Sequence, residues 1–299
     1  MNISESTTIQ ILHPQPMHIT ELRTLWKEAF GDTDAFLDTF FSTAFAPERC
    51  LCILMEHSVA AALYWFECEY QKKPLAYIYA VATAKACRGM GLCRQLLAAT
   101  HATLRQQGYI GALLVPGSKT LFDFYKKNGY KTTCYRHIEN YSLYTHINTS
   151  CSTNQISDTV TRDTGMFMIR QISASEYASL RKEFLPQESV LQEKENLLFL
   201  QTQLHFYSGE NFLAAITITD QTLYCPELLY TECSDTTIFT SEHPTQTNPS
   251  KHIMNRLLSY FDCTNGIFCS PGDSFPFAMY YPLDDSIQKA PNYFAFAFD

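Results

Sequence analysis

Two glycines, two arginines and a cysteine stand close together in the segment RGMGLCR, residues 88–94. The chain has only 11 glycines in 299 residues, yet Gly89 and Gly91 lie two positions apart, directly before a helical pattern. The N-terminus of a helix offers free N–H groups and the positive end of the helix dipole, and both favour an anion. Arg88 and Arg94 can add charge-assisted hydrogen bonds. The segment therefore predicts a phosphate or pyrophosphate site. The alternative is that the glycines only form the turn that starts the helix.

The two common nucleotide motifs do not fit this segment. A P-loop needs GxxxxGK[ST], which is absent from the chain. A dinucleotide fingerprint needs GxGxxG, and Arg94 stands where its third glycine should be. A different phosphate-bearing ligand is therefore expected.

Composition argues against several other classes of chemistry and partner. The 11 cysteines include no CxxC pair and the nine histidines have no close Cys or Asp neighbours in a ligand pattern, so no metal is expected. The net charge of −8 without a basic stripe argues against nucleic acid. No apolar run reaches membrane-spanning length, and the N-terminus does not read as a secretory signal. A cytoplasmic protein without a membrane partner is expected.

Hydrophobic periodicity places the glycine segment between a strand and a helix. In the first half it predicts strands over 7–12, 50–56, 58–70, 75–83 and 109–117, and helices over 20–31, 32–45, 91–107 and 118–130. Thr20 and Ser118 are the expected N-caps of two of these helices, and Gly31 the expected end of the first. A strand–helix–strand–helix order after antiparallel strands indicates a mixed α/β sheet with at least one parallel crossover.

The second half has a similar order of elements but no glycine-opened helix. The pattern predicts strands over 166–172, 211–220, 222–232, 266–272, 277–283 and 293–298, and helices over 173–185, 194–207 and 252–262. A polar stretch rich in Ser, Thr, Asn and Asp precedes it. We therefore expect a first domain over 1–145, a linker over 146–165 and a second α/β domain over 166–299.

The glycine segment resembles the acetyl-CoA pyrophosphate loop of the GNAT N-acetyltransferase superfamily. That family's pattern is Q/R-x-x-G-x-G/A, and Arg88, Gly91 and Cys93 match it, with Cys93 larger than the usual last residue. The segments LWKEAFGDTDAFLDTFF, YIYAVAT and LLVPGSKTLFDFYKKNGY are also similar to bacterial members, so the resemblance covers about residues 5–145. It implies a GNAT fold in the first half and a degenerate GNAT-like or related α/β domain in the second.

The resemblance also implies an activity and a set of site residues. The activity is transfer of an acetyl group from acetyl-CoA, without a metal, to the primary amine of a small molecule or peptide, by direct attack in a ternary complex. It implies that the strand end at Val81, Ala82 and Thr83 pairs with pantetheine, and that Tyr125 protonates the departing thiolate. The pyrophosphate would be held by Arg88, Gly89, Met90, Gly91, Leu92, Cys93 and Arg94.

Several roles stay open at this level. Glu67 and Glu69 are candidates for the base that removes the amine proton. Alternatively, they lie on a solvated strand face, or a water chain acts as the base. Tyr125 could instead be a core aromatic, and Cys93 either a packing residue or a thiol of lowered pKa. In one related group the terminal carboxylate acts in the active site, which makes Asp299 a further candidate.

Two other function classes compete with the enzyme. One is a non-catalytic acyl-CoA-binding regulatory protein, and the weaker one is a pure interaction protein. A homo-oligomer is compatible with the sequence. The sequence does not identify the acceptor substrate.

Overall fold

The computed structural model describes residues 9–143, 168–231 and 249–298. The chain folds into two compact units. Among the described residues, the first contains 9–135, 187–202 and 276–298, and the second contains 136–143, 168–186, 203–231 and 249–275. Each unit is described separately below.

The first unit is built on a six-stranded sheet in the order β1-β2-β3-β4-β5-β12. Its strands are β1 (Ile9–Leu12), β2 (Cys50–Met55), β3 (Ser58–Tyr70), β4 (Lys73–Thr83), β5 (Gly111–Leu114) and β12 (Phe275–Pro282). β4 and β5 run parallel, and the other neighbours are antiparallel. The predicted parallel crossover is therefore confirmed, with one helix between its two strands.

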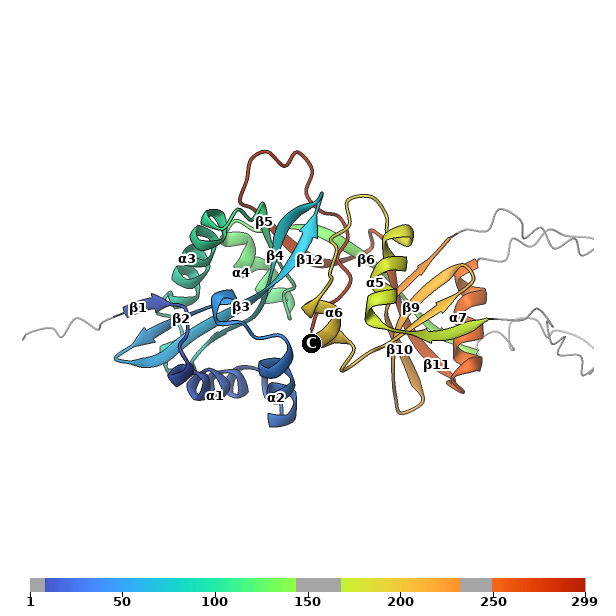
Figure 1. Cartoon of the computed structure of the whole chain (residues 1–299), viewed down its shortest axis with the longest axis horizontal. Helices are drawn as coiled ribbons and strands as arrows, with labels where there is room; N and C mark the ends of the chain where they lie inside the picture. Colours follow the sequence, from blue (N-terminus) through green and yellow to red (C-terminus); the bar gives the residue numbers. More distant parts are fainter. Residues whose placement is uncertain (1–8, 144–167, 232–248, 299) are drawn as a thin grey trace, which may run out of the picture. The chain divides into compact units, whose positions relative to one another are not determined.

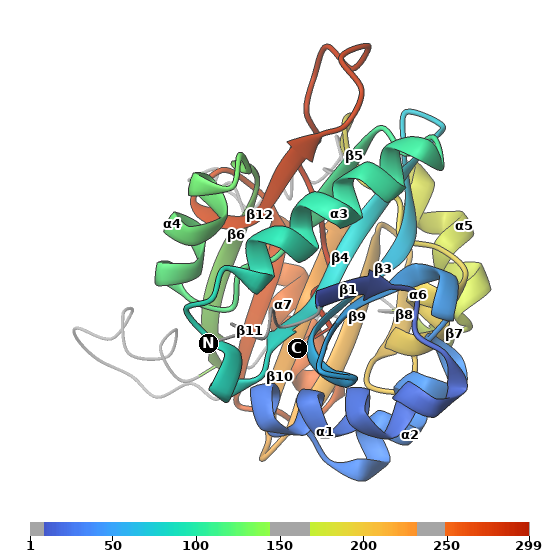
Figure 2. The ribbon, with the colours of Figure 1, turned by 90° about the vertical axis from the view of Figure 1, so that its left-hand side faces the viewer.

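Helices cover both faces of this sheet (Figures 1 and 2). They are α1 (Ile19–Phe30), α2 (Asp34–Thr43), α3 (Leu92–Gln106), α4 (Lys119–Lys127) and α6 (Glu195–Leu200), with short 3-10 turns at Pro16–His18, Pro47–Arg49 and Lys85–Cys87. Side chains of β3 alternate between the faces. Leu63 and Trp65 pack with Leu96 and Leu97 of α3, whereas Tyr64 meets Trp26 of α1, with ring centroids 5.1 Å apart.

The second unit is a second α/β layer. Its sheet has the order β6-β11-β10-β9-β8-β7, and Figure 1 shows α5 and α7 on opposite sides of it. The elements are β6 (Lys131–Ser142, from residue 136 on), β7 (Ile169–Ile172), α5 (Ala174–Phe184), β8 (His205–Gly209), β9 (Phe212–Thr219), β10 (Thr222–Tyr230), α7 (Pro249–Tyr260) and β11 (Asn265–Pro271). Under α5, the buried Arg181 pairs with Glu227, which also accepts a hydrogen bond from Tyr177.

The mixed α/β class and most elements are confirmed, with five differences. The first helix begins at Ile19 after His18, so Thr20 is inside it and is not its N-cap, whereas Gly31 ends it in the left-handed conformation as expected. Ser118 stands at the N-cap of α4 without a side-chain capping bond. The helix expected over 194–207 stops at Leu200, and its last residues form β8. The strand expected over 293–298 is a buried segment outside the sheet. Strand β6 was not expected at all.

The domain division also differs from a single cut in the chain. The expected linker, 146–165, lies outside the described residues. Within the segment expected as the second domain, 187–202 and 276–298 group with the first unit. Strand β12 explains part of this, because it pairs with β5 through Met279↔Leu114 to Pro282↔Gly111.

The described residues also bear on cysteines, metal sites and membrane spans. The nine cysteines of the described ranges are free thiols. Within those ranges, no three His, Cys, Asp or Glu side chains gather in a group that could hold a metal ion. None of the helices there is long and apolar enough to cross a membrane.

Candidate active site

A β-bulge near the end of β4 shapes the site. Ala62 of β3 faces Ala82 of β4, and Tyr64 faces Tyr79, so one residue of β3 lies opposite two of β4. Within the bulge, Ala80 has a φ of 48°, a conformation that costs a non-glycine residue about 1–3 kcal/mol. Bulges bend a strand and re-aim its side chains, and they often occur next to active sites.

The bulge coincides with a separation of the two parallel strands. The β4–β5 register ends at Ile78↔Leu114, whereas β4 continues to Thr83. The last five residues of β4 therefore have no partner in β5. Two cavities open at this place, and both are lined by Val81.

Ala80 offers a test of whether the bulge is stored strain. We expect Ala80→Val to lower the free energy of unfolding by about 2 kcal/mol, because a β-branched residue tolerates positive φ worse than alanine does. Ala80→Gly should leave stability equal or slightly raised, because glycine adopts this conformation freely but adds entropy to the unfolded chain. Urea unfolding of the three proteins measures both effects. Equal losses in both variants would contradict the strained bulge.

The glycine segment forms an open turn before α3. Gly89 and Gly91 have φ values of 80° and 78°, and a Cβ atom added at either would meet nothing within 4 Å. Gly91 is the N-cap of α3. Among the described residues, no backbone carbonyl accepts a hydrogen bond from the N–H groups of 89–94. These donors are therefore available to a ligand.

Two contacts fix this turn to the rest of the unit. The guanidinium Nε of Arg88 donates to the carbonyl of Thr83 at 3.2 Å, which joins the turn to the end of β4. The N–H of Lys85 donates to the carboxylate of Glu28 on α1 at 2.7 Å. The turn is therefore held by charge-assisted bonds at its start, while its glycines stay open.

The first cavity, here called the loop cavity, has a volume of about 580 Å³ and lies against this turn. Its only charged lining side chains are Arg88 and Arg94, in a chain whose net charge is −8. Of the residues predicted to bind the cofactor, nine line it: Val81, Ala82, Thr83, Arg88, Gly89, Gly91, Leu92, Cys93 and Arg94. Met90 does not line it, and about half of its surface is exposed. The arrangement combines two cations with free N–H groups, which suits a phosphate.

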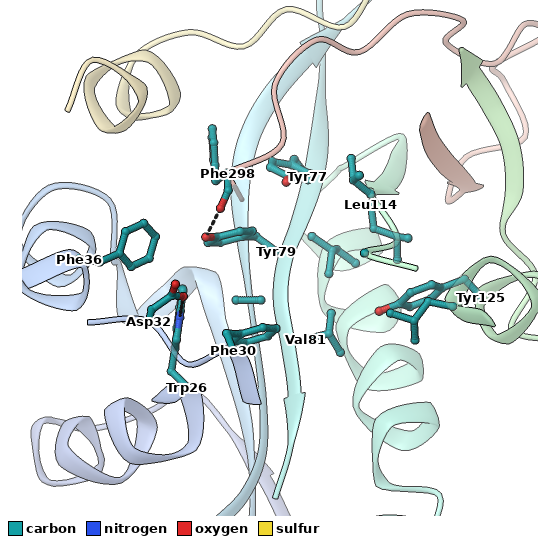
Figure 3. Close-up of a pocket in the computed structure, with 15 residues that line it drawn as sticks. Trp26, Phe30, Asp32, Phe36, Tyr77, Tyr79, Val81, Leu114, Tyr125 and Phe298 are labelled. Carbon is teal, nitrogen blue, oxygen red and sulfur yellow. Dashed lines mark hydrogen bonds between the residues drawn. The ribbon is translucent and has the colours of Figure 1, made fainter. Parts of the chain in front are cut away.

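The second cavity, here called the inner cavity, has a volume of about 350 Å³, and seven of its 15 lining residues are aromatic. Figure 3 shows Trp26, Phe30 and Phe36 on one side of β4 and Tyr125 on the other, with Tyr79 and Phe298 near the strand. Four residues line both cavities: Phe30, Val81, Leu121 and Tyr125. A ligand lying in the loop cavity can therefore present its end to the inner one.

Tyr125 stands where the two cavities meet. Its side chain is buried, with 7% of the residue exposed, and in Figure 3 its hydroxyl points toward Val81. Burial raises the pKa of Tyr125 above its usual value, so the hydroxyl keeps its proton at neutral pH. Within the described residues the hydroxyl has no hydrogen-bonding partner. It can act as a proton donor toward either cavity.

Glu67 and Glu69 are not brought to Tyr125. Neither lines the two cavities. Glu67 pairs with Ala76, five positions or roughly 16 Å along β3 from the Ala62↔Ala82 pair at the site. There it accepts a hydrogen bond from Tyr109 and lies 3.6 Å from the ammonium of Lys194. Glu69 forms backbone hydrogen bonds with Leu191. These positions argue against either carboxylate as the base and favour the alternative that both lie on a strand face away from the site.

Cys93 is a packing residue here. It is half-buried and packs against the core under α3. Burial raises the pKa of the thiol to about 11, so it is neutral at physiological pH. The alternative of a thiol with a lowered pKa is therefore wrong for Cys93, despite its place at the start of a helix.

Two residues of the inner cavity were not predicted from the sequence. Asp32, between α1 and α2, lines it and accepts a hydrogen bond of 2.7 Å from the indole N–H of the buried Trp26. Phe298 also lines it, and its carbonyl accepts a hydrogen bond of 2.5 Å from Tyr79. The sequence signal for Asp32 is weak, since it is one of three acids in DTDAFLD. Asp299 lies outside the described residues.

The comparisons with known proteins agree with this arrangement. Residues 11–133 match the family model described as an acetyltransferase (GNAT) domain. No curated protein matches the chain significantly. Among solved structures, a GCN5-related N-acetyltransferase from Kribbella flavida is similar, with a TM-score of 0.67 and 14% identity, covering 95% of this chain and 73% of that one.

Two further structures show a similar likeness. A GCN5-related N-acetyltransferase from Anabaena variabilis has a TM-score of 0.66 at 14% identity, over 93% of this chain and 73% of that one. Eis1 from Mycobacterium abscessus has a TM-score of 0.61 at 11% identity, over 93% and 74%. At these identities the likeness shows a shared fold, and its coverage includes both units. Residues 11–133 therefore match a GNAT acetyltransferase domain, and the solved structures show that the chain shares its fold with GCN5-related N-acetyltransferases.

Proposed function

We propose that the protein transfers an acetyl group from acetyl-CoA to a primary amine, by direct attack within a ternary complex. The observation that carries the proposal is a pair of cavities that share four lining residues. One is lined by Arg88, Arg94 and the open glycine turn, and the other includes seven aromatic side chains. The loop cavity would hold the pyrophosphate of CoA. Pantetheine would then run along the free edge of β4 toward Tyr125, with the thioester where the cavities meet.

The chemistry asks three things of the site. The amine nitrogen, once neutral, attacks the thioester carbonyl, and the carbon–sulfur bond breaks. The thiolate takes a proton from the Tyr125 hydroxyl. The second proton of the attacking nitrogen then restores that hydroxyl proton through solvent. A backbone N–H from the end of β4 that has no partner in β5 would face the carbonyl oxygen as negative charge develops there. The net products are an amide, CoA thiol and one proton.

No residue is assigned as the base that removes the first proton from the amine. Asp32 lines the inner cavity and is one candidate. The terminal carboxylate of Asp299 stays a proposal from the family resemblance, since Asp299 lies outside the described residues. The preceding residue, Phe298, lines the same cavity. A cytoplasmic location and a homo-oligomer also stay proposals.

The test of this function separates it from the two rival classes. Isothermal titration with acetyl-CoA should show binding, and a thiol-release assay over a panel of primary amines should show turnover with at least one. Binding without turnover by any amine would favour the acyl-CoA-binding regulatory protein. Absence of binding would remove both and leave the interaction protein.

A further inference from the structure

The acids at the start of α2 differ in whether they already have cationic partners. Asp34 and Asp38 form ion pairs with Arg23 of α1, and Asp34 also pairs with Lys27. Asp32, two residues earlier, forms no ion pair with any Lys, Arg or His of the described part of the chain. Within the described residues, its side chain accepts one hydrogen bond, from the neutral indole N–H of Trp26. Asp32 is thus a half-buried carboxylate without a counter-ion.

The surroundings of Asp32 are apolar and aromatic. Trp26 is 1% exposed, and its ring lies 6.2 Å from Phe36 and 5.5 Å from Tyr79 between centroids. Figure 3 shows Asp32 among these rings on the side of β4 away from Tyr125. Asp32 is the only ionisable carboxylate among the residues that line the inner cavity. A carboxylate in such surroundings gains most from a single cation that replaces its lost hydration.

The two cavities, which share four lining residues, have charged side chains of opposite sign. The loop cavity has two arginines and no acid among its lining residues, whereas the inner cavity has one acid and no Lys or Arg. Rings can also attract an ammonium through their faces. An acceptor with one positive charge and an apolar body meets both features, whereas a second ammonium would lie in an apolar wall without a partner.

We infer that Asp32 is the specificity-determining anion of the acceptor site, and that the acceptor class is a singly charged primary amine with an apolar or aromatic body. This inference rests on the proposed function for the place of the acceptor. Trp26 is a positioning residue, because its N–H holds one carboxylate oxygen and leaves the other to the ligand. The ammonium is bound first and must lose its proton before attack.

The experiment measures charge preference directly, by equilibrium binding to the CoA-bound protein. We use 2-phenylethylamine and its neutral isostere 2-phenylethanol as probes, with spermidine as a multiply charged comparator. In the wild type the amine should bind at least about 10-fold more tightly than the alcohol, since a hydrogen bond to a charged group contributes about 1.5–3 kcal/mol. Spermidine should bind more weakly than 2-phenylethylamine.

Asp32→Asn is the matched change, because an amide oxygen can still accept from the Trp26 N–H. It should weaken binding of the amine by about 10- to 100-fold, leave the alcohol within about 2-fold and leave acetyl-CoA binding unchanged. Asp38→Asn removes an exposed acid outside both cavities and should change none of these. Intact acetyl-CoA binding shows that a variant is folded.

Each result decides the inference separately from the proposed function. Equal binding of amine and alcohol by the wild type overturns it without any variant, as does a preference for spermidine. A preference for the amine that persists in Asp32→Asn also overturns it. A charge preference that the variant removes supports it even where no thiol is released, in which case the transfer function alone has failed.

Discussion

Tyr125→Phe should lower kcat for acetyl transfer by about 10²- to 10⁴-fold, the usual contribution of a positioned general acid. The substitution removes only the hydroxyl, and the ring that lines both cavities stays in place. The Kd of acetyl-CoA should therefore stay within about 3-fold of the wild type. Thiol release at saturating acetyl-CoA measures kcat, and titration calorimetry measures the Kd.

The pH dependence of this loss follows from the burial of Tyr125. Its pKa lies above the usual value of about 10, so the hydroxyl stays protonated at every pH below 10. The acid is present from pH 7 to 9, and the ratio of wild-type to variant kcat should be constant over this range. Burial makes the hydroxyl a weaker acid, but a thiolate leaving in the same buried place is a stronger base.

Tyr130→Phe is the matched control. Tyr130 is also buried, its ring lies 5.7 Å from that of Tyr125, and its hydroxyl is hydrogen-bonded to His101 at 2.7 Å. It lines neither cavity. We expect lower stability and nearly unchanged kcat. A similar kcat for Tyr125→Phe and the wild type would contradict the acid role and favour a purely packing tyrosine.

The loop cavity could be foreseen because its parts are local in sequence. Gly89, Gly91 and Arg88 lie within four residues, and a strand–turn–helix order suffices to bring their N–H groups together. The helix face of α3 and the parallel β4–β5 pair likewise follow from periodicity. Tyr125 required one further step, the family resemblance, because nothing in FYKKNGY itself points to a cavity.

The inner cavity could not be foreseen, because distant segments build it. Trp26, Tyr79 and Phe298 are joined only by tertiary contacts, such as the hydrogen bond from Tyr79 to the carbonyl of Phe298. The alternating residues 293–298 read as a strand, yet they pack around Tyr77 and Phe66 outside the sheet. The prediction of Glu67 or Glu69 as the base loses support for a related reason. Side-chain alternation gives the face on which Glu67 lies but not its distance along β3 from the site.

Gly91→Val should weaken acetyl-CoA binding by about 10- to 100-fold. The φ of 78° at Gly91 lies in the left-handed region, where a β-branched residue costs about 1–3 kcal/mol. The turn would relieve that strain by rotating, and the N–H groups at the start of α3 would then no longer converge on the phosphates. Titration calorimetry with acetyl-CoA measures the loss.

The other end of α3 supplies the control for that change. Gly108 has a φ of 82°, an added Cβ there meets nothing within 4 Å, and it lines neither cavity. Gly108→Val should therefore cost similar stability without loss of cofactor affinity. A short acetyl thioester that lacks the diphosphate should react equally well with Gly91→Val and the wild type, because it never uses the turn. If Gly91→Val binds acetyl-CoA as the wild type does, the diphosphate does not lie on this turn, and the assignment of the loop cavity to CoA fails with it.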